Sequence, residues 1–493
     1  MTDLDRRTFL GTAAAGGIAL AGMGVTSAAD PESDAEQYVV TATGQVRTRL
    51  EKAGVTVRAT VADDTVALVE APSGEAVRDV SGVRSVEPNV GYQAVGPAHQ
   101  STEDSWNDTL AEDQWDKHAE TTGAFEAHDT ATGAERSVAI IDTGIAPDHP
   151  DVAAEMSRGK LFRADGASAP DGSPTVDGDT TVEARLPPNG EEVAAYTYLG
   201  SPATRSQPAG DDVDSHGTHC AGIATGVHDG TTGIAGMAPD ASAVPMRVFY
   251  WKEYEGYPLD TDDDGEQEEV TVTTLWTTDF DILSAIDYAA EQEVDAANMS
   301  LGGGVLKGSA HASGEHVAYQ RVVQSAVQRG TVVTTSAGNA DADLQHEGYY
   351  TLPNSVPGSV SVSATGPSNE LAFYSNYGTS DIDVGAPGGG YGTLEKTLAS
   401  DTEWPYPTNL VLSTVPADLN DGKQYAYYAG TSMAAPQVAG LVALVREVNP
   451  DLNAKQVQSI VQNTARYSKG KSSADLGAGV VYAPDAVAEA SRR

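Results

Sequence analysis

The sequence is poor in cysteine, in basic residues and in aromatic side chains. Its 493 residues include a single cysteine, Cys220, which excludes any disulfide within the chain. Lysine and arginine together number 29 against 71 aspartate and glutamate residues, so the formal net charge is −42. A surface of this sign repels phosphate backbones and no basic patch opposes it, which disfavours nucleic-acid binding as a function.

The acidic excess also predicts the medium in which the chain works. In dilute salt such a surface repels itself strongly. In molar salt the Debye length falls to roughly 3 Å and the repulsion is screened. We interpret the composition as adaptation to a hypersaline medium. The alternative is an ordinary acidic exported protein.

Long hydrophobic runs are missing as well. The apolar stretch near the N-terminus ends at Val25, contains five glycines and is too short for a spanning helix. The pair Arg6-Arg7 precedes it, and the small residues Thr26–Ala29 follow. This order is typical of a twin-arginine export signal, so residues 1–29 are expected to be a signal peptide and the mature chain to be secreted, outside the membrane. The alternative is a disordered tail.

One serine stands at a glycine elbow before a helical pattern. Residues 430–436 read Gly-Thr-Ser-Met-Ala-Ala-Pro, and the apolar residues from Val438 to Val445 recur at helical spacing. Ser432 is therefore expected in the first turn of a helix, where unpaired N–H groups and the helix dipole favour negative charge. A serine so placed can attack a carbonyl, although a capping serine is the commoner role.

Two further motifs supply an acid and a base. Residues 137–142 form an apolar segment that ends in Asp142, and Thr143-Gly144 follows. This predicts a buried strand with a carboxylate at its end, where α/β proteins gather their sites. Residues 216–222 read His-Gly-Thr-His-Cys-Ala-Gly and predict a closely packed helix that begins at His216. An imidazole can take a proton from a serine and return it to a leaving amine.

Together these three motifs resemble those of the subtilisin-like serine proteases, the subtilases. The order Asp142, His216, Ser432 and all three local contexts match, and the resemblance extends from about Gln114 to about Pro484. It implies an orienting acid, a base and a nucleophile in that order. The acidic composition makes the chain similar to the halolysins of haloarchaea, and the Cys220 after the His motif matches the proteinase K-like branch. In the helix after the nucleophile, Gln437 stands where the family usually has histidine.

The resemblance also implies an oxyanion donor and a substrate cleft. Residues 331–339 predict a strand that ends at Asn339, whose side-chain amide would bind the oxyanion. Ser300, Leu301 and Gly302 would pair with an extended peptide and form one pocket wall, and Ala337 and Gly338 would form the other. The pocket floor is expected near residues 351–353. Broad endopeptidase activity follows from such backbone recognition.

The segment from Asp30 to Gly96 differs from the rest of the chain in its pattern of strand and helix signals. Its strand and helix signals follow a β-α-β-β-α-β order, which is ferredoxin-like and resembles the inhibitory propeptide of subtilases. The expected organisation is a signal peptide (1–29), the propeptide (30–96), a linker with the maturation site (97–113) and the peptidase domain (114–493). The alternative for the second segment is a permanent regulatory domain.

From Gln114 onward, strand and helix signals alternate, which predicts an α/β fold with a doubly wound, mainly parallel sheet and helices on both faces. Two acidic insertions, residues 156–212 and 251–280, are expected to be surface loops. The expected strands are 137–142, 243–248, 294–299, 331–336, 359–364 and 410–414, and the expected helices are 216–226, 281–292, 315–329, 437–448 and 453–465.

Structural calcium is predicted at two places. Asp260, Asp262 and Asp264 precede Gly265 at the alternating spacing of a calcium loop, although Thr271 replaces its last ligand. The resemblance implies a second site, with its ligands at Gln114, Asp151, the Val227 carbonyl and Asp229.

These patterns predict a secreted, halophilic serine endopeptidase that acts as a monomer, needs no cofactor for its chemistry and is inhibited by its own propeptide. Its partners would be protein and peptide substrates. One alternative is a limited-processing subtilase that cuts few surface or secreted proteins. The other is a non-catalytic exported binding protein with the same fold.

Overall fold

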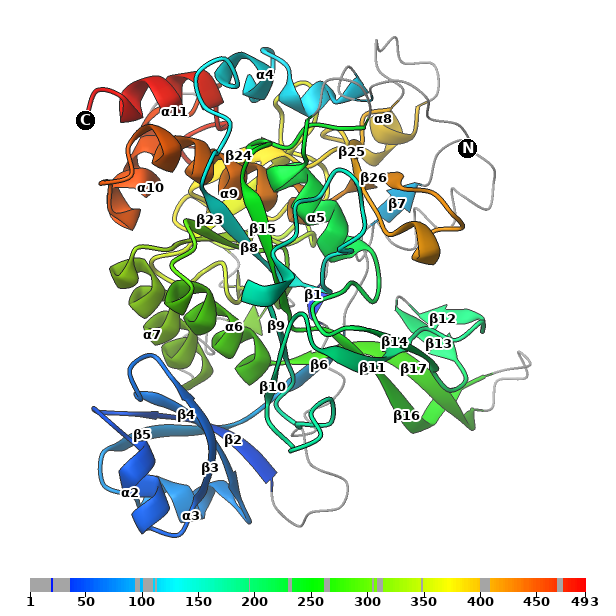
Figure 1. Cartoon of the computed structure of the whole chain (residues 1–493), viewed down its shortest axis with the longest axis vertical. Coiled ribbons are helices and arrows are strands. Elements are labelled where there is room, and N and C mark those ends of the chain that lie inside the picture. Colours follow the sequence, from blue (N-terminus) through cyan, green and yellow to red (C-terminus); the bar gives the residue numbers. More distant parts are fainter. Residues whose placement is uncertain are drawn as a thin grey trace.

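A central eight-stranded sheet organises the chain (Figure 1). The strand order is β10-β9-β15-β8-β18-β21-β23-β24, and every neighbouring pair is parallel except β10 with β9. The strands are β8 (Ser137–Asp142), β9 (Lys160–Phe162), β10 (Thr175–Asp177), β15 (Ser242–Arg247), β18 (Ala296–Met299), β21 (Val332–Ser336), β23 (Val360–Thr365) and β24 (Val384–Pro387). The computed structural model describes residues 19–20, 36–93, 98–100, 110, 113–194, 196–228, 233–260, 267–303, 306–307, 314–346, 349–399, 408–467 and 473–493.

Helices cover both faces of this sheet. Right-handed crossovers place the helix between β8 and β15 on the opposite face from the helices that precede β18 and β21. Because both faces are covered, the inner strands are buried along their whole length and are apolar rather than alternating. The helices are α5 (His216–Thr225) and α9 (Thr431–Val448), which pack together, α6 (Asp279–Glu291) and α7 (Gly314–Arg329), which also pack together, and the C-terminal α10 (Ala454–Asn463) and α11 (Ala483–Ala490).

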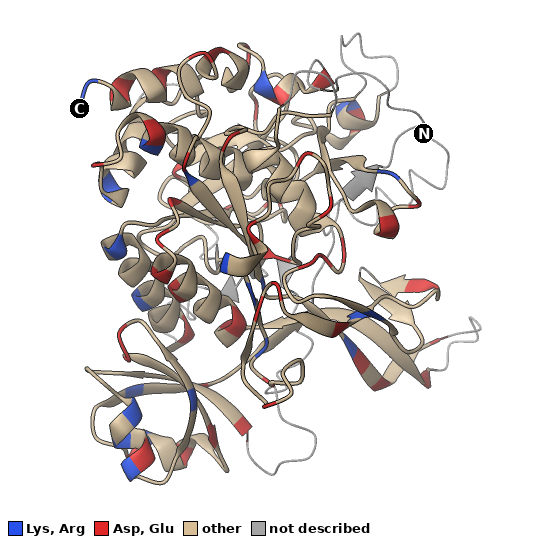
Figure 2. Ribbon diagram, in the orientation of Figure 1, with Lys and Arg blue, Asp and Glu red and all other residues tan. Residues whose placement is uncertain are grey.

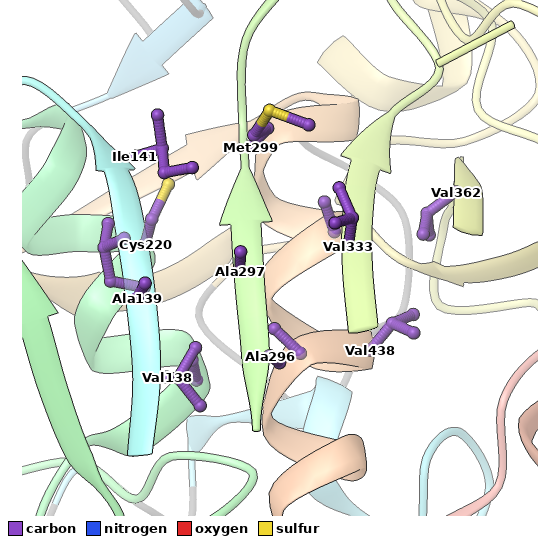
Figure 3. Close-up of a cluster of buried hydrophobic side chains, with 14 of the residues drawn as sticks. Val138, Ala139, Ile141, Cys220, Ala296, Ala297, Met299, Val333, Val362 and Val438 are labelled. Carbon is purple, nitrogen blue, oxygen red and sulfur yellow. The ribbon is translucent and has the colours of Figure 1, made fainter. Parts of the chain in front are cut away.

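The core lies between the central strands and the α5–α9 pair. Small side chains such as Ala139 and Ala297 on neighbouring strands let these helices approach the sheet closely (Figure 3). Cys220 of α5 is fully buried among them, beside Ile141. This confirms the α/β prediction, and it shows Cys220 packed as a small hydrophobic residue.

Residues 36–93 contain a separate four-stranded antiparallel sheet with its own apolar core. We call this part, Glu36–Gln93, the N-terminal unit. Its sheet order is β3-β4-β2-β5, the ferredoxin-like arrangement that the sequence predicts. The elements are β2 (Glu36–Ala42), α2 (Arg47–Lys52), β3 (Thr56–Val61), β4 (Val66–Ala71), α3 (Gly74–Arg78), β5 (Val83–Pro88) and β6 (Gly91–Gln93).

The N-terminal unit packs against α6 and α7. Val39 and Leu68, on the face of its sheet opposite to its own helices, join the large core of the rest of the chain. Arg321 of α7 donates to the carbonyls of Ala42 and Thr65, and Asp287 of α6 accepts the backbone N–H of Ala62. The unit therefore binds the helix pair through an apolar centre with polar bonds around it (Figure 1).

The prediction that both acidic insertions are surface loops is wrong. They contain strands that pair into two antiparallel sheets, β11 with β14 and the set β12-β13-β17-β16, and β6 of the N-terminal unit extends the second one. Side chains of β11 and of the outer half of the β16–β17 hairpin are largely polar and exposed, whereas Val272–Thr278 of β17 are buried. Because the exposed strands lack a regular apolar alternation, their sequence does not predict a sheet. The strands are β11 (Thr181–Leu186), β12 (Glu192–Ala194), β13 (Thr197–Leu199), β14 (Ala203–Pro208), β16 (Tyr250–Leu259) and β17 (Glu268–Thr278).

A small sheet leads into α9. Its central strand β26 pairs with β25 and with β7, a segment that follows the N-terminal unit. In the part of the chain that the structure describes, no helix is long and apolar enough to cross a membrane. The remaining elements are β25 (Val411–Thr414), β26 (Tyr425–Ala429), β7 (Ala98–Gln100), β1 (Ala19–Leu20) paired with β19 (Gly302–Gly303), β20 (Leu306–Lys307) paired with β22 (Tyr349–Tyr350), α4 (Ala124–Ala127), α8 (Leu394–Leu398) and the 3₁₀ turns η2 (Trp115–Lys117), η3 (Met156–Arg158) and η5 (Ala417–Leu419).

Candidate active site

Three neighbouring strands, β8, β18 and β21, end at one edge of the central sheet. Asp142 is the last residue of β8, Ser300 and Leu301 follow β18, and Ala337–Asn339 follow β21. The N-terminal end of α9, with Ser432 in its first turn, packs on the same strands. The parallel sheet thus gathers the predicted site residues, as expected for the carboxyl ends of its strands.

Asp142 and His216 form a fully buried pair. The imidazole Nδ1 donates to both carboxylate oxygens, at 2.8 Å to Oδ1 and 2.9 Å to Oδ2, and both side chains are 0% exposed. Burial lowers the pKa of His216, but the Asp142 charge and hydrogen bond outweigh it and raise the pKa well above its usual value. His216 Nε2 is buried and has no hydrogen-bond partner among the described residues. The pair thus fixes the tautomer and leaves Nε2 able to take a proton.

The Thr143 hydroxyl and a second carboxylate, that of Asp212, fix the position of Asp142 relative to the helix that carries His216. Thr143 Oγ1 accepts the Gly217 N–H and donates to Asp212, whose other oxygen accepts from the backbone and hydroxyl of Thr218. Gly217 allows this approach, since a Cβ there would stand 2.1 Å from the Gly144 carbonyl oxygen. Sequence reasoning missed Asp212, which looks like one more acid in the run from Asp211 to Asp214.

Ser432 lies at the start of α9 and is 1% exposed. Its hydroxyl donates to the Ser300 carbonyl at 3.2 Å, and the Ser300 hydroxyl donates back to the Ser432 carbonyl at 2.7 Å. Cys220 Sγ lies 3.5 Å from the same Ser432 carbonyl and 3.9 Å from His216 Nδ1. The thiol thus contacts both Ser432 and His216, which places α5 and the first turn of α9 side by side at the Asp142–His216 pair.

The side-chain amide of Asn339 lies beside Gly430 and Thr431. Its oxygen accepts hydrogen bonds, whereas its nitrogen has no partner among the described residues. Its Oδ1 accepts from the backbone N–H and the hydroxyl of Thr431, both at 2.8 Å. Its Nδ2 is buried without a hydrogen-bond partner in the described chain, 3.5 Å from where a Cβ would stand on Gly430. A buried donor that is held in place and unpartnered costs stability unless something else binds it.

The loop that carries Asn339 depends on another asparagine that sequence reasoning missed. Asn376 donates to the Ala337 carbonyl at 2.9 Å and accepts the backbone N–H groups of Ala340 and Ala342, each at 3.0 Å. Gly338 lies between Ala337 and Ala340 in the chain and has a φ of +98°. A Cβ at this position would lie 2.5 Å from Asn376 Nδ2. No signal in the sequence distinguishes Asn376 from an ordinary turn residue.

A carboxyl group with a raised pKa, Asp214, interacts with His216. Burial, with the neighbouring Asp212 charge, raises the pKa of Asp214 to about 7. As Asp214 ionises, it adds negative charge near the imidazole. That charge favours the imidazolium form.

The residues predicted to bind substrate follow the carboxyl ends of the neighbouring strands β18 and β21. Ser300 and Leu301 are fully buried and tied to the other strand, because Ser336 Oγ donates to the Leu301 carbonyl at 3.3 Å. Gly302 faces open space: a Cβ there would meet only the carbonyl oxygens of Ser336 and Leu352, at 3.9 and 4.0 Å. Ala337 and Gly338 follow β21 on the far side, and residues 351–353 lie where a pocket floor is predicted.

The predicted calcium ligands are only partly described. Gln114 bonds with both amide atoms to the backbone of Ala235, and Asp151 Oδ2 accepts from the Ile234 N–H and the Tyr425 hydroxyl. Both side chains bond to the segment Ile234–Ala235, which follows Val227 in the chain. Asp229, Asp262 and Asp264 lie outside the described residues, and Asp260 directly follows β16.

One other group could ligate a metal by proximity. Asp142, His216 and Cys220 offer ligand atoms within 4.8 Å of one another, the only such set of three in the described chain. Asp142 and His216 are hydrogen-bonded to each other, and the buried Cys220 thiol packs beside them. We therefore interpret this set as a hydrogen-bonded pair with a neighbouring thiol.

Comparison with known proteins decides the family. The model of the subtilase family, Peptidase_S8, matches residues 133–479. The chain belongs to the subtilase family. Among curated relatives, an extracellular protease of Xanthomonas campestris pv. campestris is 34% identical over 388 residues, which cover 78% of this chain and 57% of that protein. Thermitase of Thermoactinomyces vulgaris is 30% identical over 343 residues, covering 69% of this chain and 85% of thermitase.

Solved structures show the same fold. Epidermin leader peptide processing protease of Staphylococcus aureus matches with a TM-score of 0.62 at 19% identity, over 94% of this chain and all of that chain. Fervidolysin of Fervidobacterium pennivorans matches with a TM-score of 0.58 at 21% identity, over 96% of this chain and 63% of fervidolysin. The subtilisin-like α/β fold predicted from the sequence is therefore confirmed.

In this subtilase a buried polar cluster accounts for Gln437. The Gln437 amide donates to Asp116 Oδ2 at 2.6 Å and accepts from Lys117 Nζ at 2.6 Å, and Lys117 lies 3.0 Å from the Asp116 carboxylate. All three side chains are fully buried. An amide can both donate and accept, so Gln437 suits a site that contains both a carboxylate and an ammonium group.

Proposed function

We propose that this subtilase is a serine endopeptidase with Ser432 as nucleophile, His216 as base and then acid, and Asp142 as the residue that orients His216. The observation that carries the proposal is the Asp142–His216 pair with an unpartnered Nε2, linked through Cys220 to the Ser432 carbonyl in the first turn of α9. An orienting carboxylate, an imidazole and a serine are the three groups that acyl transfer needs.

The reaction proceeds in two halves. Ser432 Oγ attacks the scissile carbonyl carbon while its proton moves to His216 Nε2. The resulting imidazolium is stabilised by Asp142 and gives the proton to the departing amine, which leaves an acyl-enzyme on Ser432. Water then attacks the ester with His216 again as base, and the acid product leaves.

Asn339 is proposed to bind the oxyanion together with the Ser432 backbone N–H. Its free Nδ2 beside Gly430 supports this role, because a donor held in place by Oδ1 needs no reorganisation when charge develops.

Replacing Asn339 with aspartate tests this role. Aspartate keeps the acceptor for Thr431 and removes the donor, so kcat should fall on the order of 10²–10³-fold with little change in KM. Asn463→Asp, on the exposed side of α10, serves as a matched control and should keep full activity. Unchanged kcat in Asn339→Asp would remove Asn339 from the mechanism.

The substrate is proposed to be an extended peptide bound by backbone pairing along Ser300–Gly302, with Ala337 and Gly338 opposite. The parallel pairing of β1 with Gly302–Gly303 supports it, because this edge accepts an added strand. Such recognition is tolerant of sequence and favours broad specificity. Casein digestion into many fragments, rather than a few defined cuts, separates this proposal from a limited-processing protease.

The N-terminal unit is proposed to be an inhibitory propeptide that the enzyme removes from itself. At the end of the unit β6 pairs with β17, and the next paired segment, β7, lies against β26, the strand that leads into Ser432. The chain therefore passes from the α6 side to the nucleophile side within ten residues. Most of the proposed linker, residues 97–113, lies outside the described residues, but Gln114–Lys117 are buried and bonded to the body, which favours a cut before them.

Secretion by the twin-arginine route, activity as a monomer and kinship with the halolysins stay proposals. Paired arginines, acidic composition and the extracellular protease among the relatives support them. Structural calcium also stays a proposal, supported only by Gln114 and Asp151 meeting at one loop, and no chemical step needs it.

Halophily is proposed from the charge. Acidic residues lie on helices, hairpins and loops over the whole molecule, with few basic residues between them (Figure 2). Dialysis from molar salt to ~50 mM, where the Debye length exceeds 10 Å, should abolish peptidase activity and secondary structure. Restoring KCl tests reversal, and sucrose at matched osmolality is the control that should not rescue. Full activity at ~50 mM salt would contradict halophily.

A further inference from the structure

The start of both α6 and α7 is capped by the N-terminal unit. The backbone N–H of Asp279 donates to the Val90 carbonyl at 3.1 Å, and that of Phe280 donates to Asn89 Oδ1 at 3.1 Å. The Gly314 N–H donates to Glu87 Oε1 at 3.3 Å. These N–H groups have no partner within their own helices, so the segment 87–93 satisfies them only while the unit is docked.

Two carboxylates meet one phenol at this place. Tyr92 of the N-terminal unit has its hydroxyl oxygen 3.2 Å from Asp279 Oδ2 and 3.1 Å from Glu315 Oε1. Tyr319 of α7 donates to the other oxygen of Asp279 at 3.0 Å. Tyr92 has one hydroxyl hydrogen and can donate it to only one of the two carboxylates. The remaining contact is favourable only if the second carboxyl group carries a proton.

The surroundings favour that proton. Val39, Pro88, Leu283 and Ala318 line the space beside the two carboxyl groups with apolar atoms. Burial raises the pKa of Asp279 well above its usual value, with the charge of Glu315 adding to it, and burial raises the pKa of Glu315 too.

The other titratable groups nearby supply no positive charge that would stabilise both carboxyl groups in their ionised form. Glu87 lies on the N-terminal side and adds negative charge, and Tyr319 is already a donor. His316 follows Glu315 on α7 and packs edge-on against the Tyr350 ring. Among the described residues, no lysine or arginine forms an ion pair with Asp279 or Glu315. The basic residues nearest on the N-terminal side, Arg78 and Arg84, line a separate pocket with Glu87.

We propose that Asp279 and Glu315 share one proton through Tyr92 while the N-terminal unit is docked, and that loss of this proton to solvent releases the unit. The interface is thus a latch that holds at low pH and opens as pH rises. The idea rests on the proposed role of the unit as an inhibitory propeptide, and it adds the condition under which inhibition ends.

The direction follows from proton linkage. When the unit leaves, water reaches both carboxyl groups, their pKa values return toward the usual range and the shared proton is released. Docking is therefore strongest at pH values below the usual carboxyl pKa. It weakens as the pH rises from there to the raised pKa values of the docked state. With one proton released, the equilibrium constant for undocking rises up to about tenfold per pH unit inside this interval.

Hydrogen exchange on the full chain tests the latch. The chain carries Ser432→Ala so that it stays in one piece, and exchange at the start of α6 and α7 is followed in high salt from pH 5 to 9, corrected for intrinsic exchange. Protection of the Asp279, Phe280 and Gly314 amides should fall with rising pH, by up to about tenfold per unit.

Two variants make the test specific. Glu315→Gln offers an amide in place of the protonated acid, so protection should persist to high pH. Asp279→Asn should act likewise and serves if Glu315→Gln does not fold. Glu51→Gln, an exposed site on α2, is the matched control and should keep the pH response of the parent. Protection that is independent of pH in the parent, or identical pH curves for the parent and Glu315→Gln, would overturn the latch.

This readout needs no peptidase activity. The latch can therefore fail while the wild-type chain still matures through Ser432. Failure of the proposed function has a separate signature, which is cleavage of the Ser432→Ala chain at the wild-type rate.

Discussion

Replacing Ser432 with alanine should lower kcat by about 10⁶-fold and leave the chain at its precursor length. In the proposed mechanism Ser432 supplies the oxygen that becomes the acyl-enzyme, and His216 Nε2, which has no hydrogen-bond partner among the described residues, takes its proton. Alanine removes the hydroxyl, and within the described part of the chain that hydroxyl bonds only to the Ser300 carbonyl. Peptidase assays and mass measurement on the same sample in high salt give both results.

The control for this change is Ser459→Ala in α10. That serine accepts from Asn463 far along the sequence from the site, and the variant should mature and digest casein like the wild type. Normal self-processing by Ser432→Ala would contradict the account, because the precursor would then be cut by another group.

Replacing Asp142 with asparagine should lower kcat by about 10⁴-fold with a small change in KM. The carboxylate accepts the Nδ1 proton at 2.8 and 2.9 Å, and an amide of the same shape can instead donate, which favours the wrong tautomer of His216. The imidazolium formed during the reaction also loses its neighbouring negative charge.

The same variant should shift the pH profile. The base must be neutral to act, so activity rises as pH passes through the pKa of His216. Asp142 raises that pKa well above its usual value, and the asparagine variant should therefore show its acid limb at lower pH than the wild type.

A second aspartate–histidine pair provides the control. Asp343 bonds to His346 at 2.9 Å on an exposed loop. Asp343→Asn breaks an equivalent contact and should change neither kcat nor the pH profile. If the acid limb of the Asp142→Asn variant coincided with that of the wild type, the Asp142 charge would have no influence on the pKa of His216, which would contradict its proposed role.

Much of the catalytic layout could be predicted because it is local. A strand that ends in Asp142, a helix that begins at His216 and a helix that begins next to Ser432 each follow from a few adjacent residues, and the parallel order then brings them to one edge. The N-terminal unit could be predicted for the same reason, since its strands and helices follow apolar patterns and its topology is a common one.

The parts that sequence reasoning missed depend on distant contacts. Asp212 bonds to the Thr143 hydroxyl and Asn376 to the Ala337 carbonyl, partners that are remote in the sequence, and nothing in their neighbours marks them. The strands of residues 156–212 are largely polar and exposed, so their sequence predicts loops although β11 pairs with β14. In residues 251–280 the buried part of β17 carries four threonines, Thr273, Thr274, Thr277 and Thr278, and its pairing with β16 rather than an apolar run marks it as a strand.

The latch residues illustrate the same limit. Tyr92, Asp279 and Glu315 stand far apart in the sequence and each is unremarkable there, but the docked N-terminal unit brings them to one point. Only the fold shows that one hydroxyl hydrogen must serve two carboxyl groups.

The most direct test of the central claim is covalent labelling of Ser432. The mature protein is incubated with a fluorophosphonate probe in high salt, digested and mapped by mass spectrometry. The account predicts one labelled peptide, carrying the phosphonate on Ser432, and loss of labelling in Asp142→Asn and His216→Ala. A protein that is folded but unlabelled at Ser432, or labelled at another serine, would contradict the proposed mechanism and favour an exported binding protein with a subtilase fold.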